Sequence, residues 1–305
     1  MSANTIYLIT GGNRGWPPLL PLSYCVPSLP LSPSLTQSEP GIGFGLTATL
    51  LLRPRTTVIA TIRSEATAQD DLHALPVGEN SRLIITYLDL SSYSPETETE
   101  METKQAHLPL HTPQNLYRVL TSTHHITHLH TIIASAGHGT SFHALVSTSP
   151  SSLLQHFQIN TLGPIRLFQA LYPLLEGVES KFVLVSSSLG SIAAMDTQAG
   201  TEPTLAYGAS KAAANYFCRK VHFECGGITA LAVHPGWVKT GNGQAFADAV
   251  GVKEPPMSLN DSVKGVLKQV SFFFFIRSDG MEVEARFTFL QSVRWEAGDG
   301  WAGQG

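Results

Sequence analysis

Short apolar runs rich in β-branched residues recur along the chain, and segments with helical periodicity separate them. Runs of this length are typical of strands buried on both faces of a parallel sheet. Six strands are expected, at residues 5–10, 56–62, 82–88, 129–134, 181–186 and 228–233. Helices are expected at residues 41–51, 151–175, 207–224 and 258–268. This alternation predicts an α/β fold with a doubly wound parallel sheet, in a single domain spanning residues 1–270.

Two stretches depart from this rhythm. Residues 16–41 follow the first predicted strand, carry seven prolines and show no usable period. That composition is incompatible with a helix and with a central strand. We therefore interpret residues 16–41 as an insertion foreign to the fold, most simply an unspliced intron. The alternative is a genuine surface loop, since closing it costs only about 3 kcal/mol.

The second departure begins after residue 270, with four consecutive phenylalanines and then a tail rich in glycine and tryptophan. We expect the last helix to end at Lys268 and residues 271–305 to form an irregular tail outside the fold. Two explanations stay open for this tail, an edge strand or the read-through of a second intron.

Composition narrows the class of protein. The 305 residues are 43% hydrophobic and 14% charged, with a net charge of −4, as in an ordinary soluble globular protein. The charge argues against a nucleic-acid partner, and the longest apolar runs are too short to span a membrane. Three scattered cysteines favour a reducing compartment, and the N-terminus has no basic region of a signal peptide. We therefore expect a cytoplasmic protein.

A glycine turn follows the first predicted strand and is divided by the insertion. Gly11, Arg14 and Gly15 precede it, whereas Ile42 and Gly43 open the helix behind it. Without residues 16–41 the two parts join as one continuous phosphate-binding turn. Such a turn lets the backbone approach a pyrophosphate, and the helix N-terminus supplies N–H groups.

Further candidate cofactor residues lie at the ends of the next strands. Arg63 follows the second strand, and an arginine there suits the 2′-phosphate of NADP, whereas a carboxylate would suit NAD. With Arg14 on the same side, NADP is favoured, although each arginine is also explained as a solvated surface charge. Asp89 and Leu90 end the third strand, where a carboxylate can meet the adenine. Ala136 and Gly137 follow the fourth strand, and their small size lets the backbone pass close to a cofactor.

The candidate chemistry centres on Tyr207 and Lys211, which share one face of a predicted helix because they are four residues apart. A nearby ammonium group lowers the pKa of a phenol, so Tyr207 becomes usable as an acid or base. Ser187 lies twenty residues upstream, at the end of the fifth strand. Alone, this spacing is common and a plain surface helix explains it as well.

Asn160 lies within an apolar helix face, just before a Gly-Pro pair that predicts a kink. It is either a satisfied core amide or a residue that opens the helix to hold a water. The histidines at positions 124, 125, 128 and 130 have no cysteine or carboxylate partner, so no metal site is predicted.

In combination, these motifs resemble the short-chain dehydrogenase/reductase family, which has a Rossmann fold. The resemblance covers residues 5–15 and 42–270. Within it, the sequences of residues 207–216 and 234–238 resemble those of fungal ketoreductases of the norsolorinic-acid-reductase type. It implies that Tyr207 protonates a carbonyl oxygen as NADPH delivers hydride, and that Lys211 holds the nicotinamide ribose. It further implies that Ser187 binds the carbonyl, that Asn160 holds a relay water, and that the nicotinamide is lined by Pro235, Val238 and Thr240.

The expected function is therefore an NADPH-dependent reductase of a small-molecule ketone, with an aromatic polyketide ketone as the family's suggestion and a homo-oligomer left open. Ser135 stands where the family usually has Asn, which is expected to weaken a contact that braces the strands. The competing hypothesis is a catalytically silent protein whose divided glycine turn cannot seat the cofactor. An epimerase or dehydratase on the same fold is less favoured.

Overall fold

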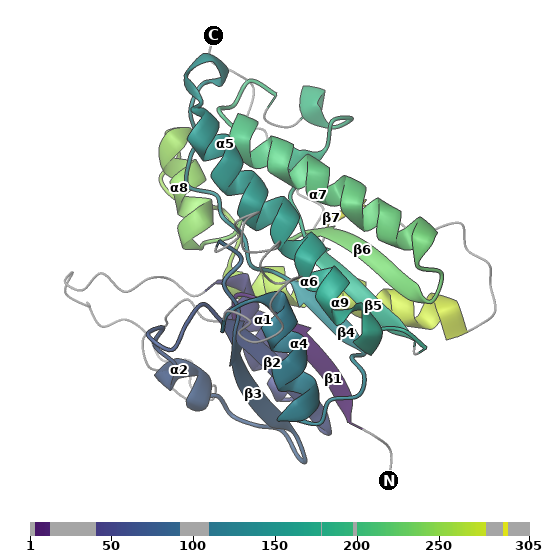
Figure 1. The fold of residues 1–305 in the computed structure, drawn as a ribbon. Coiled ribbons are helices and arrows are strands. Elements are labelled where there is room, and N and C mark those ends of the chain that lie inside the picture. Colours follow the sequence, from purple (N-terminus) through teal and green to yellow (C-terminus); the bar gives the residue numbers. More distant parts are fainter. Residues whose placement is uncertain are drawn as a thin grey trace, which may run out of the picture.

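The structure is a computed structural model, which describes residues 4–12, 41–91, 110–177, 179–197, 200–278 and 289–291. Its centre is a seven-stranded sheet in the order β3-β2-β1-β4-β5-β6-β7 (Figure 1). Every neighbouring pair of strands is parallel. The strands are β1 (Thr5–Ile9), β2 (Thr56–Ile62), β3 (Arg82–Tyr87), β4 (Thr131–Ala134), β5 (Ser180–Val185), β6 (Ile228–His234) and β7 (Phe289–Gln291). The predicted doubly wound parallel sheet is confirmed.

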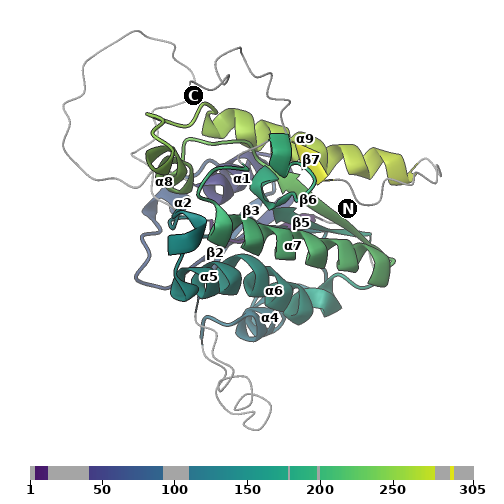
Figure 2. The same cartoon turned by 90° about the horizontal axis from the view of Figure 1, so that it is seen from above.

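Helices cover both faces of the sheet, as the view from above shows (Figure 2). They are α1 (Ile42–Leu51), α2 (Asp70–His73), α4 (Pro113–Ser122), α5 (Pro150–Phe157), α6 (Gly163–Leu171), α7 (Leu205–Glu224), α8 (Gly241–Ala249) and α9 (Leu259–Ser278). One core joins the sheet to α4, α6 and α7, and the other joins it to α1 and α9. Adjacent residues of β1 show the reason, because Leu8 belongs to the first core and Ile9 to the second.

The predicted helix over residues 151–175 is divided in the structure. α5 leads into a π turn, Gln158–Leu162, before α6 begins at Gly163. The predicted irregularity at Asn160 is therefore present as a π turn. A π turn inserted into a helix is frequent at functional sites.

The end of the chain differs from the expectation. α9 does not end at Lys268 but continues to Ser278, and Phe289–Gln291 pairs with β6 as an edge strand. Residues 271–278 and 289–291 thus belong to regular elements, and of the two explanations left open for the tail, residues 289–291 show the edge strand. The physical reason is that β6 would otherwise expose an unpaired edge. The proline-rich residues 16–40 lie outside the described residues, whereas Gly41 caps α1.

Residues 240–257, between β6 and α9, contain helix α8. Thr240 is the N-cap of α8, and its Oγ1 accepts a hydrogen bond from the Gly243 amide at 3.2 Å. The base of this segment is closed by backbone bonds from Lys239 N–H to Met257 O and from Met257 N–H to Trp237 O.

Candidate active site

A cavity of about 1220 Å³ lies at the carboxyl ends of the strands. The strand order reverses between β1 and β4, and this switch point is where open α/β sheets bind ligands. The cavity is lined by all the predicted cofactor residues that the structure describes, together with Ser187, Tyr207 and Lys211. Those lining it are Gly11, Ile42, Gly43, Arg63, Asp89, Leu90, Ala136, Gly137, Pro235, Val238 and Thr240. Arg14 and Gly15 lie outside the described residues.

The three predicted reactive side chains come together on one wall. The Ser187 hydroxyl lies beside the Tyr207 phenol, whose pKa it lowers. The Lys211 ammonium lies 5.7 Å from the centre of the Tyr207 ring and donates to the Val185 carbonyl at 2.9 Å. Helix α7 packs this closely on the turn after β5 because Gly190 has no side chain, since a Cβ there would lie 2.7 Å from the Lys211 Cβ.

Burial dominates the ionisation of this wall. It raises the pKa of Tyr207 to about 12, an effect that the hydrogen bond from Ser187 partly offsets. Burial also lowers the pKa of Lys211 to about 8. The expectation that Lys211 lowers the pKa of Tyr207 is therefore wrong for the protein by itself. Both charged forms lose more hydration than they gain from each other.

Asn160 lies behind this wall and does not line the cavity. Its Oδ1 accepts from the His138 amide at 2.8 Å, and its Nδ2 donates to the His138 carbonyl at 2.8 Å and to Ser210 Oγ at 3.0 Å. The side-chain amide is thus satisfied, and the π turn also opens the helix at this residue, so features of both interpretations are present. Asn160 fastens the loop after β4 to helix α7.

The wall that carries the predicted cofactor residues is shaped by backbone and by the absence of side chains at its glycines. Gly11 has a φ of +71°, and a Cβ on Gly43 would lie 2.4 Å from the Gly11 carbonyl. The Ser135 hydroxyl donates to the Thr10 carbonyl, and the Ala136 amide donates to Thr10 Oγ1 at 3.0 Å. Ser135 therefore braces β4 against β1.

Arg63 is exposed at the far end of the cavity, beside a turn that the sequence motifs did not indicate. In this turn, Thr67 also lines the cavity, and its hydroxyl accepts from the Ser64 amide at 3.3 Å. Glu65 is the first acidic residue after β2, and its Oε2 lies 3.0 Å from His111 Nε2.

At the opposite end, His234 connects β6 with the turn that carries Ser187. Its Nδ1 accepts a hydrogen bond from the Ser188 amide at 3.2 Å. Burial lowers the pKa of His234 to about 4, so at neutral pH the ring is uncharged and able to accept. His234 thereby holds the Ser187 turn at the end of β6.

Aromatic rings continue the wall away from Tyr207. The centre of the Phe142 ring lies 6.0 Å from that of Tyr207 and 5.1 Å from that of Phe246, which in turn lies 5.1 Å from Trp237. All four residues line the cavity. Phe142 follows β4 and Phe246 belongs to α8, so no local motif predicts that they meet.

Within the part of the chain that the structure describes, no three His, Cys, Asp or Glu side chains gather as metal ligands. None of the helices over those same residues is both long and apolar enough to cross a membrane.

Comparison with known proteins gives the family. A family model described as enoyl-(acyl carrier protein) reductase matches residues 77–256. A norsolorinic acid ketoreductase of Aspergillus parasiticus is 35% identical over 289 residues, covering 92% of this chain and 90% of the relative. A second, from Dothistroma septosporum, is 34% identical over 239 residues, covering 77% and 82%. The chain belongs to the short-chain dehydrogenase/reductase family.

Two solved structures named as carbonyl reductases share the fold. NADPH-bound carbonyl reductase from chicken fatty liver aligns with a TM-score of 0.62 at 22% identity, over 88% of each chain. The carbonyl reductase Sniffer of Drosophila melanogaster aligns with a TM-score of 0.61 at 22% identity, over 88% of this chain and 92% of that one. Together with the ketoreductases, the family supports an oxidoreductase that acts on carbonyl or alcohol groups.

Proposed function

We propose that this protein reduces a ketone to an alcohol with NADPH. The observation that carries the proposal is the meeting of Ser187, Tyr207 and Lys211 on one wall of the cavity. A hydroxyl and a phenol that lie side by side form a donor pair for one carbonyl oxygen. NADPH, when bound, supplies the hydride.

In this mechanism Tyr207 donates its proton to the oxygen that becomes the alcohol. Its raised pKa keeps the phenol protonated at neutral pH, which favours the reductive direction. Ser187 stabilises the developing negative charge, and the buried Lys211 holds the ribose and stabilises the phenolate left behind. Asn160 positions the wall through its bonds to His138 and Ser210.

The residues at the other end fit a phosphorylated dinucleotide. One continuous cavity joins the glycine turn, Arg63 and the Tyr207 wall. Gly43 lets the start of α1 pack against the glycine turn, since a Cβ there would lie 2.4 Å from the Gly11 carbonyl. We assign NADP rather than NAD because Arg63 suits the 2′-phosphate and Glu65 is engaged by His111.

The substrate that best suits the cavity is an aromatic ketone. Phe142, Phe246 and Trp237 extend from the Tyr207 ring as a row of aromatic faces, on which a planar ring stacks favourably. The two fungal relatives are named for reduction of norsolorinic acid, in keeping with such a substrate.

The test is NADPH oxidation, followed by absorbance, with a panel of aromatic and aliphatic ketones. Turnover with NADPH and a preference for aryl ketones are expected, together with a lower rate with NADH. A chain that binds NADPH but reduces no ketone in the panel would contradict the proposal.

The competing possibility is that the divided glycine turn leaves the protein unable to bind cofactor. Gly41 caps α1, and deletion of residues 16–41 would bring Gly15 to the same place before Ile42. NADPH titration of the full chain and of the deletion variant separates the two hypotheses. Binding by both supports the enzyme, whereas binding by the deletion variant alone assigns the fault to the insertion.

A further inference from the structure

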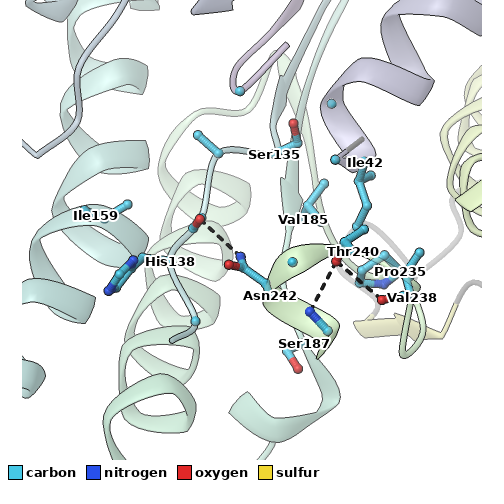
Figure 3. A pocket seen from close by; sticks show the side chains of 18 of the residues that line it. Ile42, Ser135, His138, Ile159, Val185, Ser187, Pro235, Val238, Thr240 and Asn242 are labelled. Carbon is cyan, nitrogen blue, oxygen red and sulfur yellow. Dashed lines mark hydrogen bonds between the residues drawn. The ribbon is translucent and has the colours of Figure 1, made fainter. Parts of the chain in front are cut away.

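Helix α8 covers the cavity and is joined to its opposite wall at its first turn. Asn242 Nδ2 donates to the Gly137 carbonyl at 3.3 Å, across the space between α8 and the loop after β4 (Figure 3). Helix α8 and the loop after β4 approach closely, since a Cβ on Gly139 would lie 3.8 Å from Asn242 Cγ and 3.0 Å from the Tyr207 ring. Asn242 therefore joins the two walls beside the reactive phenol.

The rest of α8 is fastened to its own side of the cavity. Trp237 Nε1 donates to the Gly243 carbonyl at 3.0 Å, and Gln244 Nε2 donates to the Lys253 carbonyl at 3.0 Å. Lys239 and Glu254 form an ion pair of 3.0 Å near the base of the segment. These contacts shape the segment without reaching the opposite wall.

The aromatic row depends on the same junction. Phe246 comes from α8 and Phe142 from the loop after β4, and their ring centres are 5.1 Å apart. If α8 moved away from the loop, the row would break between these two rings. The stacking surface for a flat substrate therefore exists only while both walls are held together. Tyr207 and Ser187 do not belong to α8, so they do not move with it.

We propose that Asn242 is a positioning residue that holds α8 against the Gly137 loop and thereby sets the preference for flat aromatic ketones over small aliphatic ones. The proposal rests on the ketone reduction proposed above and adds its selectivity. An aspartate at position 242 has no N–H to donate to the Gly137 carbonyl, so it breaks the contact at nearly constant size.

The test compares 1-tetralone with cyclohexanone, two ketones that differ by one fused benzene ring. Relative to the unaltered protein, Asn242→Ala and Asn242→Asp should lower kcat/KM for 1-tetralone by roughly tenfold, in line with the loss of aromatic stacking. The kcat/KM for cyclohexanone should fall by less than about threefold, since its binding does not need the aromatic row. Gln244→Ala is the matched control, because it removes an amide from the same helix outside the cavity, and it should leave the ratio of the two ketones unchanged.

A wild-type protein without a preference for 1-tetralone overturns the proposal, as does a preference that survives in both Asn242 variants. Hydrogen exchange of residues 241–249 gives a readout independent of turnover, and it should be faster in both Asn242 variants. If neither ketone is reduced, the ketone reduction itself fails. The exchange rates then decide the role of Asn242, and unchanged rates overturn it.

Discussion

The two ends of the cavity are built on different principles. At the cofactor end, backbones meet where side chains are missing, as at Gly11 and Gly43. At the reaction end, polar side chains are held individually, as in the hydrogen bond that Lys211 donates to the Val185 carbonyl. Substitutions at the first end should therefore act through shape, and those at the second through protons and charge.

The largest effect is expected for Tyr207→Phe, at the reaction end. The ring remains, but the proton donor is lost, so kcat should fall about a thousandfold. NADPH affinity should stay within about twofold, since the shape of the cavity is preserved. Stopped-flow turnover and fluorescence titration measure the two quantities. Tyr216→Phe is the control, as Tyr216 is 70% exposed on the same helix; equal turnover in both variants would remove Tyr207 from the mechanism.

The cofactor end is tested by Gly43→Ala. The new Cβ would lie 2.4 Å from the Gly11 carbonyl and 2.7 Å from Ser135 Oγ, so the backbone must move apart. The Kd for NADPH should rise about a hundredfold, which corresponds to about 2.7 kcal/mol. Isothermal titration measures it. Gly226→Ala makes the same chemical change in open space and should not alter binding; unaltered binding by Gly43→Ala would mean that the close approach is not needed.

Much of this arrangement is predictable because it follows from local sequence. Buried strands are recognisable as apolar runs, and a parallel sheet brings all their carboxyl ends to one edge. Arg63, Asp89 and Pro235 could therefore be assigned to one site from their places after strands. The four-residue spacing of Tyr207 and Lys211 fixed their common face in the same way.

What escaped prediction depends on contacts between distant segments or on burial. Phe142 and Phe246 meet only through the folded chain, and nothing near either residue marks it as part of the site. The pKa of Tyr207 rises because the tertiary structure removes water, whereas sequence spacing reveals only the neighbouring lysine. The extension of α9 was missed because a run of phenylalanines lacks helical period, although helix α9 still includes it.

Lys211→Met tests the reaction end of the cavity through the stability of the protein. Burial lowers the pKa of Lys211 from 10.5 to about 8, so its charge costs the folded state about 3 kcal/mol below pH 8. Loss of its bond to the Val185 carbonyl offsets about 1 kcal/mol, which leaves a gain of about 2 kcal/mol in the free energy of unfolding at pH 7.

The sign follows from proton binding. Between pH 8 and 10.5 the unfolded chain binds more protons at this site, so the wild-type protein gains stability as the pH rises. The advantage of Lys211→Met should therefore shrink over this window. Urea unfolding at pH 7, 8, 9 and 10 measures this difference in the free energy of unfolding. The control is Lys220→Met, at an exposed position on the same helix. A variant less stable than wild type at pH 7 would show that the buried charge is well compensated.

The smallest effect is expected for Arg63→Ala, where the cofactor end relies on charge rather than on shape. Arg63 is exposed, so solvent weakens its attraction for a phosphate, and the Kd for NADPH should rise only about tenfold. The Kd for NADH, which lacks the 2′-phosphate, should not change. Arg219→Ala, on the exposed face of α7, controls for loss of a positive charge. Because screening acts on an exposed charge, the difference between the two cofactors should narrow as salt is raised from 0.05 to about 0.5 M. Equal weakening of NADPH and NADH would place Arg63 away from the 2′-phosphate.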